Sequence, residues 1–241
     1  MEKPVTLDAP LTSLPGIGPQ RAALFARLNV RTVGELLRLY PRTYEDRTRL
    51  VSIASLEAGT PACFEAAVVT TPRTNRIPKP GSRMLEVTKF TVADDTGRLN
   101  LTFFNAAHSA GALRVGERYC FYGVLTGDYA AYGMTNPLFE PCDGPARVTR
   151  RILPVYPLTA GLTNSMVLRA QAQAVSRCAG LLPETLPPEL LRRYGLCGAA
   201  EACREIHCPT SAAALGRAQR RLVFEEFFLF SAALAIVRSR R

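Results

Sequence analysis

The sequence lacks the pattern Gly-x4-Gly-Lys-Ser/Thr, and none of its three lysines follows a glycine. That pattern forms the phosphate-binding loop of P-loop NTPases, so we expect this chain not to bind ATP through such a loop. No Ser-His-Asp set and no pair of carboxylates stands out as a catalytic group either. These absences predict a non-catalytic piece that carries no cofactor of its own.

Long apolar runs are also lacking. The longest, "FFLFSAALAIV" (227–237), is shorter than the roughly 18 residues that suggest a membrane-spanning helix, so we expect a helix in water and no membrane partner. The first residues, "MEKPVTLDAP", are polar and do not resemble a secretory signal. Seven cysteines, an odd number, argue against a disulfide framework and for a reducing, cytoplasmic setting.

Metal-binding residues have unsuitable spacing. Cys197, Cys203, His207 and Cys208 are close in the sequence but contain no Cys-x2-Cys pair. Because His207 and Cys208 are adjacent, the group is a poor fit to a tetrahedral zinc site. We expect no metal site, and we interpret Cys208 as a small core residue.

Positive charge is plentiful. The chain has 30 Lys and Arg residues and 20 Asp and Glu residues, which gives a net charge of +10. This charge predicts a polyanionic partner. All but three of the basic residues are arginines, which suit bidentate phosphate contacts, although a GC-rich genome would produce the same bias. Nearly half of the residues are hydrophobic, as in globular proteins.

Three segments differ in pattern. Residues 1–50 and 147–241 show helical periodicity, whereas residues 51–146 are rich in β-branched and aromatic residues. The middle segment contains five such runs, "FEAAVVTT", "LEVTKFTVADD", "GRLNLTFFN", "ERYCFYGVLT" and "YGMTNPLFE", with the helical stretch "AAHSAGALRVG" after the third. This is the element order of an OB-fold, although an SH3-like barrel or a sandwich has a similar strand count. We therefore predict an α+β multi-domain chain, a five-stranded OB-fold β-barrel flanked by N-terminal and C-terminal helical segments.

Helix boundaries carry their usual signals. Pro19 fits the first position of a helix, and Thr32 and Glu35 have the spacing of a capping box. Pro188 opens a short helix, and a longer one begins near Ala212. This last helix is apolar on more than one face and needs cover on several sides. We expect a fragment whose remainder packs there.

The stretch "LPGIGPQRA" places Gly16 and Gly18 directly before a helix. Glycines there let the backbone turn tightly, so that N–H groups and the helix N-terminus point at an anion such as a DNA phosphate. The stretch resembles the hairpin of the helix-hairpin-helix family, with Arg21 one turn into the helix. The alternative is a tight corner in which Ile17 fills the core.

A basic arm, "PRTNRIPKPGSR" (72–83), lies between the first two predicted strands. It has no acidic residue, and its prolines keep it extended; its cations are Arg73, Arg76, Lys79 and Arg83. Nucleic acid commonly runs past this position of an OB-fold. We predict DNA contact, with a solvated loop as the alternative.

The third predicted strand alternates in character. Leu99, Leu101 and Phe103 have one parity and belong inside the barrel, so Phe104 shares the other face with Arg98. An exposed phenylalanine beside cations can stack on an unpaired base, worth roughly 1–3 kcal/mol per base. The alternative is that Phe104 is covered by the helical stretch or by another domain. Tyr129 and Tyr132, in the turn between the fourth and fifth predicted strands, extend this predicted platform.

The stretches "YPRTYEDR", "ILPVYPLTAGLT", "LPETLPPELLRRYGL" and "RRLVFEEFFLF", together with the glycine hairpin, resemble the N-terminal part of the RecG family of ATP-dependent DNA helicases. The resemblance covers nearly the whole chain. It implies a wedge domain with an OB-fold, carried ahead of two motor domains that use ATP and Mg²⁺. The family's wedge splits strands at stalled replication forks and Holliday junctions during repair and recombination, and Phe103 and Phe104 match its stacking position. Cys208 and Ser231 depart from the family's usual aromatic and glutamine.

Two other functions remain open. The basic barrel is a possible docking platform for a protein partner or for the motor. RuvA-type junction binders and NAD-dependent DNA ligases also join an OB-fold to a helix-hairpin-helix, but they place the barrel first. Here the hairpin comes first, so branched DNA is the favoured partner.

Overall fold

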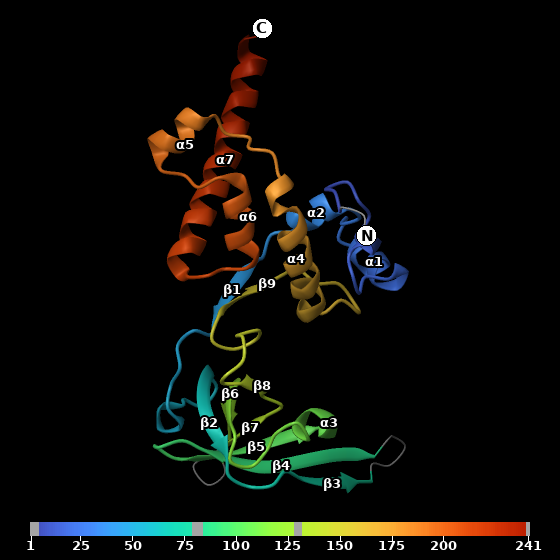
Figure 1. The fold of residues 1–241 in the computed structure, drawn as a ribbon, viewed down its shortest axis with the longest axis vertical. Coiled ribbons are helices and arrows are strands. Elements are labelled where there is room, and N and C mark those ends of the chain that lie inside the picture. The colour runs from blue at the N-terminus through green and yellow to red at the C-terminus, as the bar shows by residue number, and fades with distance from the viewer. Residues whose placement is uncertain (1–4, 79–83, 128–131, 240–241) are drawn as a thin grey trace. The chain divides into compact units, whose positions relative to one another are not determined.

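The computed structural model describes residues 5–78, 84–127 and 132–239. The chain divides into two compact units. One, the barrel unit, spans Asp46–Arg151; the other, the helical unit, combines the residues up to Glu45 with those from Ile152 onward (Figure 1). The sequence had suggested separate segments at 1–50, 51–146 and 147–241, but the first and last of these share one hydrophobic core.

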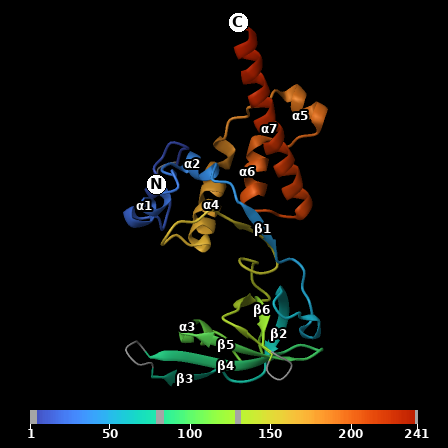
Figure 2. The same ribbon diagram turned by 180° about the vertical axis from the view of Figure 1, so that it is seen from behind.

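The barrel unit is an OB-fold. Its strands pair in the order β2-β4-β5-β7-β6, and β2 pairs back onto β6, which closes a five-stranded barrel. β5 and β7 run parallel, and β8 extends the sheet from β6. β3 pairs with β4 at the rim of the sheet (Figure 2). The elements are η2 (Ile53–Ser55), β2 (Pro61–Val68), β3 (Arg73–Ile77), β4 (Leu85–Ala93), β5 (Arg98–Phe104), α3 (Ala107–Ala110), β6 (Arg118–Thr126), β7 (Gly133–Thr135) and β8 (Leu138–Pro141).

Alternating residues build the barrel core. In β5, Leu99, Leu101 and Phe103 are buried while the residues between them are exposed or half-buried. The ring of Phe103 stacks on Phe90 of β4 with 5.7 Å between centroids. The parity predicted for this strand is confirmed, because one face of a closed barrel must be its interior.

One buried carboxylate fixes the chain after β8. Glu140 accepts hydrogen bonds from the backbone N–H groups of Arg147, Val148 and Thr149, at 3.0, 3.1 and 3.0 Å. Burial alone would raise the pKa of Glu140, but the hydrogen bonds from the Thr149 hydroxyl and from the N–H groups hold it below the usual 4.5. The Glu140 carboxylate thus accepts hydrogen bonds from three backbone N–H groups that do not take part in β-sheet pairing.

The helical unit is built mainly from helices, with one two-stranded sheet formed by β1 and β9. Its elements are η1 (Leu11–Ser13), α1 (Pro19–Ala26), α2 (Val33–Leu37), β1 (Thr43–Asp46), β9 (Ile152–Val155), α4 (Asn164–Cys178), η3 (Ala179–Leu181), α5 (Pro188–Tyr194), α6 (Ala199–His207) and α7 (Ala212–Ser239). The predicted capping box is confirmed: Thr32 accepts from the Glu35 N–H, and Glu35 accepts from the Thr32 N–H. The predicted starts at Pro19, Pro188 and Ala212 are confirmed as well.

A buried histidine ties the N-terminal part of the helical unit to its C-terminal part. His207 Nε2 lies 2.9 Å from the Leu37 carbonyl oxygen, and its Nδ1 lies 2.9 Å from the Tyr156 hydroxyl. Since a carbonyl only accepts, Nε2 carries the proton and Nδ1 accepts from the tyrosine. Burial lowers the pKa of His207 to about 4, so the ring is neutral at neutral pH.

The helix α7 has two different halves. Its first half packs against α6, and its fully buried Arg221 is held between Glu184 and Glu225 at 2.5 and 2.6 Å. Its second half exposes large apolar side chains, including Phe227 at 67% and Phe230 at 62%. Within the described residues, no helix is long and apolar enough to cross a membrane.

Candidate nucleic-acid interface

A groove of about 660 Å³ runs over the outer face of β4, β5 and β7; we call it the outer groove. Strand register explains its lining. Lys89 pairs with Arg73 on one side and with Thr102 on the other, so that all three side chains point away from the barrel core. Asn100, half-buried Tyr132 and the residues after β2 complete its walls.

Gly133, which lines the groove, lets β7 approach β5 closely. A Cβ atom at this position would lie 2.8 Å from the Asn100 carbonyl oxygen, closer than two such atoms can approach. The missing side chain lets β7 pair in parallel with β5, where Asn100 is opposite Gly133.

The basic arm differs from the sequence-based expectation. Its first part is not a loop, because residues 73–77 form β3 and pair with β4. Arg73 lines the outer groove, but Arg76 has the opposite parity and forms an ion pair with Glu86 at 3.0 Å. The arm contains no acidic residue, but β4, with which it pairs, contains Glu86. Lys79 and Arg83 lie outside the described residues.

Lys89 was missed as a site residue. It lies between Phe90 and Thr88, which both point into the barrel, and it is exposed beside Arg73. The alternation of "VTKFTV" was a signal that could have revealed it. The outer groove therefore brings together two cations from neighbouring strands.

Phe104 lies at the end of β5 and is 39% exposed. Two asparagines with left-handed backbones fix this position, Asn105 (φ 51°) and Asn136 (φ 46°). The Phe104 N–H donates to Asn136 Oδ1 at 2.8 Å, and the Asn105 N–H donates to the Glu86 carbonyl at 2.8 Å. These hydrogen bonds fix the backbone of Phe104 and of the residue that follows it, and so fix the position of the ring.

A second hollow of about 400 Å³ lies beside Phe104 and is lined by Pro137 and Leu138. Most of its lining residues are apolar, whereas most of those that line the outer groove are polar or charged. Because Asn100, Leu101 and Thr102 line the outer groove and Phe103 and Phe104 line the hollow, the two sites follow one another along β5. This arrangement has room for one extended strand of nucleic acid along both sites.

Two expected contact residues are placed differently. Phe103 is 3% exposed and packs against Phe90 and Phe139, so its ring is unavailable to a base; the pairing of Phe103 with Phe104 as contact residues is corrected. Arg98 has the parity of Phe104 but stands six residues earlier, roughly 20 Å along an extended strand. Arg98 is exposed there and is not a neighbour of the ring. Tyr129 lies outside the described residues.

The glycine turn belongs to the helical unit. Gly16 has φ 78°, a conformation that favours glycine, and its carbonyl accepts a 2.6 Å hydrogen bond from Arg21 Nη1. Gly18 is the N-cap of α1, and Ile17 is buried in the core. The turn therefore has the geometry of the alternative interpretation, a tight turn whose Ile17 side chain packs in the core. Arg21, in the first turn of α1, is exposed.

A family model described as the RecG wedge domain matches residues 11–177. The ATP-dependent DNA helicase RecG of Escherichia coli K12 is 32% identical over 252 residues, covering 97% of this chain and 34% of the relative. The RecG of a Synechocystis species is 30% identical over 239 residues, with 93% and 28% covered.

A solved structure, that of RecG bound to a three-way DNA junction, superposes on the whole of this chain with a TM-score of 0.87 and 25% identity. This chain covers 32% of that protein. The chain thus spans about a third of the length of the relatives that it matches. Since the family model matches well over half of its residues, this chain belongs to the RecG wedge domain family.

Proposed function

We propose that this chain is a wedge module that binds branched DNA, at replication forks and Holliday junctions, through the outer face of its barrel. The observation that carries this proposal is the exposed ring of Phe104 at the end of β5. A ring that is fixed by its backbone and open to solvent can stack on a base that has lost its partner.

The outer groove supports a path for a single strand toward that ring. Arg73 and Lys89 supply positive charge for backbone phosphates, and Tyr132 offers a further ring. Asn100 and Thr102 line the same path and can hydrogen-bond to bases or sugars. The strand would cross β4 and β5 and reach Phe104 at the point where the duplex opens.

In the parent protein, we propose that motor domains hydrolyse ATP with Mg²⁺ and draw duplex DNA past the wedge during repair and recombination in the cytoplasm. Two observations support this role: the relatives are ATP-dependent helicases about three times as long as this chain, and α7 exposes Phe227 and Phe230. Those apolar side chains suit a protein surface, so α7 is the proposed contact with the motor.

The decisive experiment replaces Phe104 with alanine. We expect fork DNA to bind about tenfold more weakly, because about 1–3 kcal/mol of base stacking is lost, while linear duplex binds as before. Fluorescence anisotropy measures the affinity, and 2-aminopurine placed at the branch point reports unstacking.

Val115→Ala is the matched control, because Val115 is also an exposed apolar residue of the barrel unit and lines neither site. It should bind forks like the unchanged chain. Equal fork affinity and equal 2-aminopurine fluorescence for the unchanged chain and Phe104→Ala would overturn the stacking role. If fork DNA does not bind at all at low salt, docking of a protein partner becomes the better function for the barrel.

A further inference from the structure

The helical unit contains a pocket of about 250 Å³ between the turn at Pro15–Ile17 and the first turns of α4; we call it the turn–helix pocket. Its polar lining consists of Arg21, Thr163, Ser165, Arg169 and Gln173. Among the described residues, none of those that line it is acidic. A pocket with two guanidinium groups and no carboxylate favours an anion.

Arg21 and Arg169 both have N–H groups that are free to bind a ligand. Arg169 is exposed, and in the described part of the chain it forms no hydrogen bond or ion pair. Arg21 uses Nη1 for the Gly16 carbonyl, which leaves most of the five N–H donors of its guanidinium for a ligand. Guanidinium groups match the oxygens of a phosphate in geometry as well as in charge.

The pocket is also held open by its own contacts. Gln173 Nε2 donates to the Pro15 carbonyl at 2.9 Å, which joins α4 to the glycine turn. At the start of the same helix, the hydroxyls of Thr163 and Ser165 are 3.1 Å apart. Because the two walls are tied together before a ligand arrives, binding requires little ordering.

The size of the pocket limits the ligand. At about 250 Å³ it is smaller than the roughly 300–1,000 Å³ typical of sites for drug-sized molecules. A single phosphate group fits this description better than a whole nucleotide does. The start of α4, a helix of 15 residues without an acid in its first turn, adds partial positive charge.

We propose that the turn–helix pocket binds one phosphate group and that, in the complex with DNA, this is a backbone phosphate. The choice of DNA as the source rests on the proposed function; the binding of phosphate does not. The sequence had suggested Gly16, Gly18 and Arg21 for such a contact. Of these three residues, Gly16 and Arg21 line the pocket and Gly18 does not. Arg169 of α4, which the sequence did not indicate, lines it as well.

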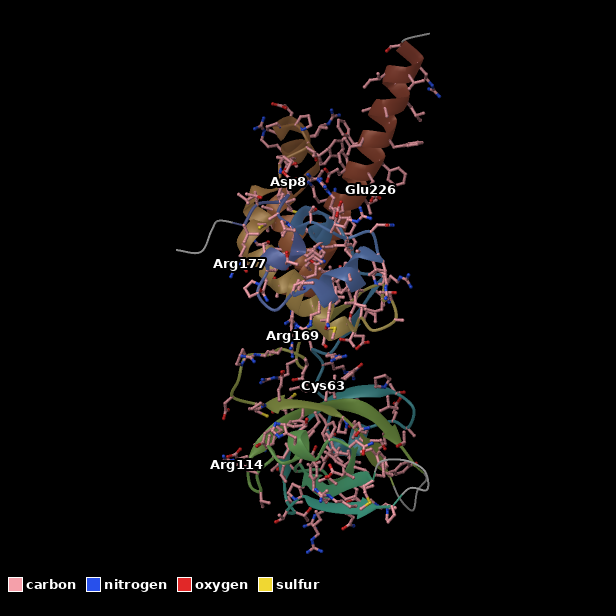
Figure 3. All side chains as sticks on the ribbon, turned by 90° about the vertical axis from the view of Figure 1, so that its right-hand side faces the viewer. Asp8, Cys63, Arg114, Arg169, Arg177 and Glu226 are labelled. Atoms are coloured by element: carbon pink, nitrogen blue, oxygen red, sulfur yellow. The ribbon has the colours of Figure 1, made fainter. Side chains whose placement is uncertain are left out.

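The first test uses inorganic phosphate and two-dimensional ¹H–¹⁵N NMR on the 241-residue chain, with chloride at equal ionic strength as the reference. We expect the amide signals of Gly16 and Ser165 to shift with phosphate and not with chloride. Arg169→Ala should weaken this response at least tenfold. Arg177→Ala is the control, since it removes the same charge from the same helix; Figure 3 shows Arg169 and Arg177 at different points along α4.

The second test uses fork DNA. Arg169→Ala should lower the slope of log K against log salt by about 0.9, the value for one lost phosphate contact, and Arg177→Ala should leave the slope closer to that of the unchanged chain. Shifts of the same two amide signals by fork DNA would identify a backbone phosphate as the source. Shifts with inorganic phosphate alone would support the pocket and assign it to a free phosphate ligand.

Unshifted Gly16 and Ser165 signals with both ligands would overturn the proposal. That failure is separable from failure of the proposed function. Loss of the pocket leaves the effect of Phe104→Ala on fork binding intact, whereas absence of fork binding leaves the phosphate titration unaffected.

Discussion

The barrel unit and the helical unit bury different polar groups for the same purpose. In the barrel unit, the carboxylate of Glu140 gathers three backbone N–H groups after the last strand. In the helical unit, the neutral ring of His207 connects α6 to the Leu37 carbonyl and to Tyr156. Each group satisfies backbone or side-chain atoms that regular structure leaves unpaired, but the two respond to acid in different pH ranges.

The surfaces of the two units differ as well. The barrel unit places cations and one aromatic ring on a rigid sheet, where strand register fixes their spacing. The helical unit leaves a long apolar stripe on α7. A rigid polar sheet suits a nucleic acid, and an exposed apolar helix suits a protein partner. The two separately built cores therefore carry two chemically different surfaces.

The largest expected effect tests whether the two cores are independent. Phe103→Ala removes a ring from the barrel core and should cost the barrel unit about 3–5 kcal/mol of unfolding free energy. We expect NMR signals of the barrel unit to lose dispersion at low urea while those of the helical unit persist. If both sets of signals disappear together, the units fold as one.

Acid should separate the two units next. Because the pKa of folded His207 is lowered to about 4 from 6.5, the unfolded chain takes up a proton below pH 6.5 and the folded helical unit does not. Stability of this unit should therefore fall with decreasing pH by up to about 1.4 kcal/mol per pH unit, roughly 3 kcal/mol by pH 4.

Urea unfolding at pH 7.5, 5.5 and 4.5, followed by signals of each unit, measures this difference. The barrel unit should keep its stability over the upper part of that range, because the lowered pKa of Glu140 makes its contribution disappear only as the pH falls below 4.5. His207→Gln should abolish the slope of the helical unit. Replacement of the other histidine, the exposed His108 of α3, with Gln should leave that slope in place.

Removal of the carboxylate anchor gives a smaller effect, confined to the barrel unit. Glu140→Gln leaves buried N–H groups without their charged acceptor, and we expect a loss of about 2 kcal/mol in chemical denaturation. Glu57→Gln, at an exposed carboxylate of the same unit, should stay within about 0.5 kcal/mol of the unchanged chain. A similar loss in both variants would mean that net charge, and not the anchor, sets this stability.

The smallest expected effect concerns the outer groove. Arg73→Ala and Lys89→Ala should each lower the salt dependence of single-strand binding by about 0.7 in slope. Arg76→Ala provides the comparison, because its side chain has the opposite parity and is paired with Glu86. Fluorescence titrations from 50 to 300 mM salt separate the three variants. Equal slopes for all three would show that the cations act only through net charge.

Much of the local structure was predictable. The starts of α1, α5 and α7, the capping box at Thr32 and the alternation of β5 all follow from short-range chemistry, and the structure confirms them. The segment 147–241 was predicted to be helical, but α4 and α6 were not delimited within it, and the strand β3 was not anticipated. Their sequences carry many small or polar residues, and they are stabilised by neighbours that are distant in the sequence, such as the partner of β3 on β4.

The candidate site was predictable only in part. Parity correctly separated Phe104 from Phe103, but the resemblance to a family joined them as contact residues, and burial corrects this. Arg76 was assigned by counting charges within its own segment, which ignored the acid on the opposite strand. Lys89 was overlooked because its neighbour Arg73 is sixteen positions away in the sequence.

By itself, the sequence determined the composition of this protein, its positive charge and the periodicities that set helix and strand. These properties depend on each residue and its near neighbours. Only the tertiary structure decided that the first and last segments share a core, that Arg73 meets Lys89 and that Arg21 and Arg169 line one pocket. The reason is physical: strand pairing and helix packing bring together groups whose separation along the chain carries no record of their distance in space.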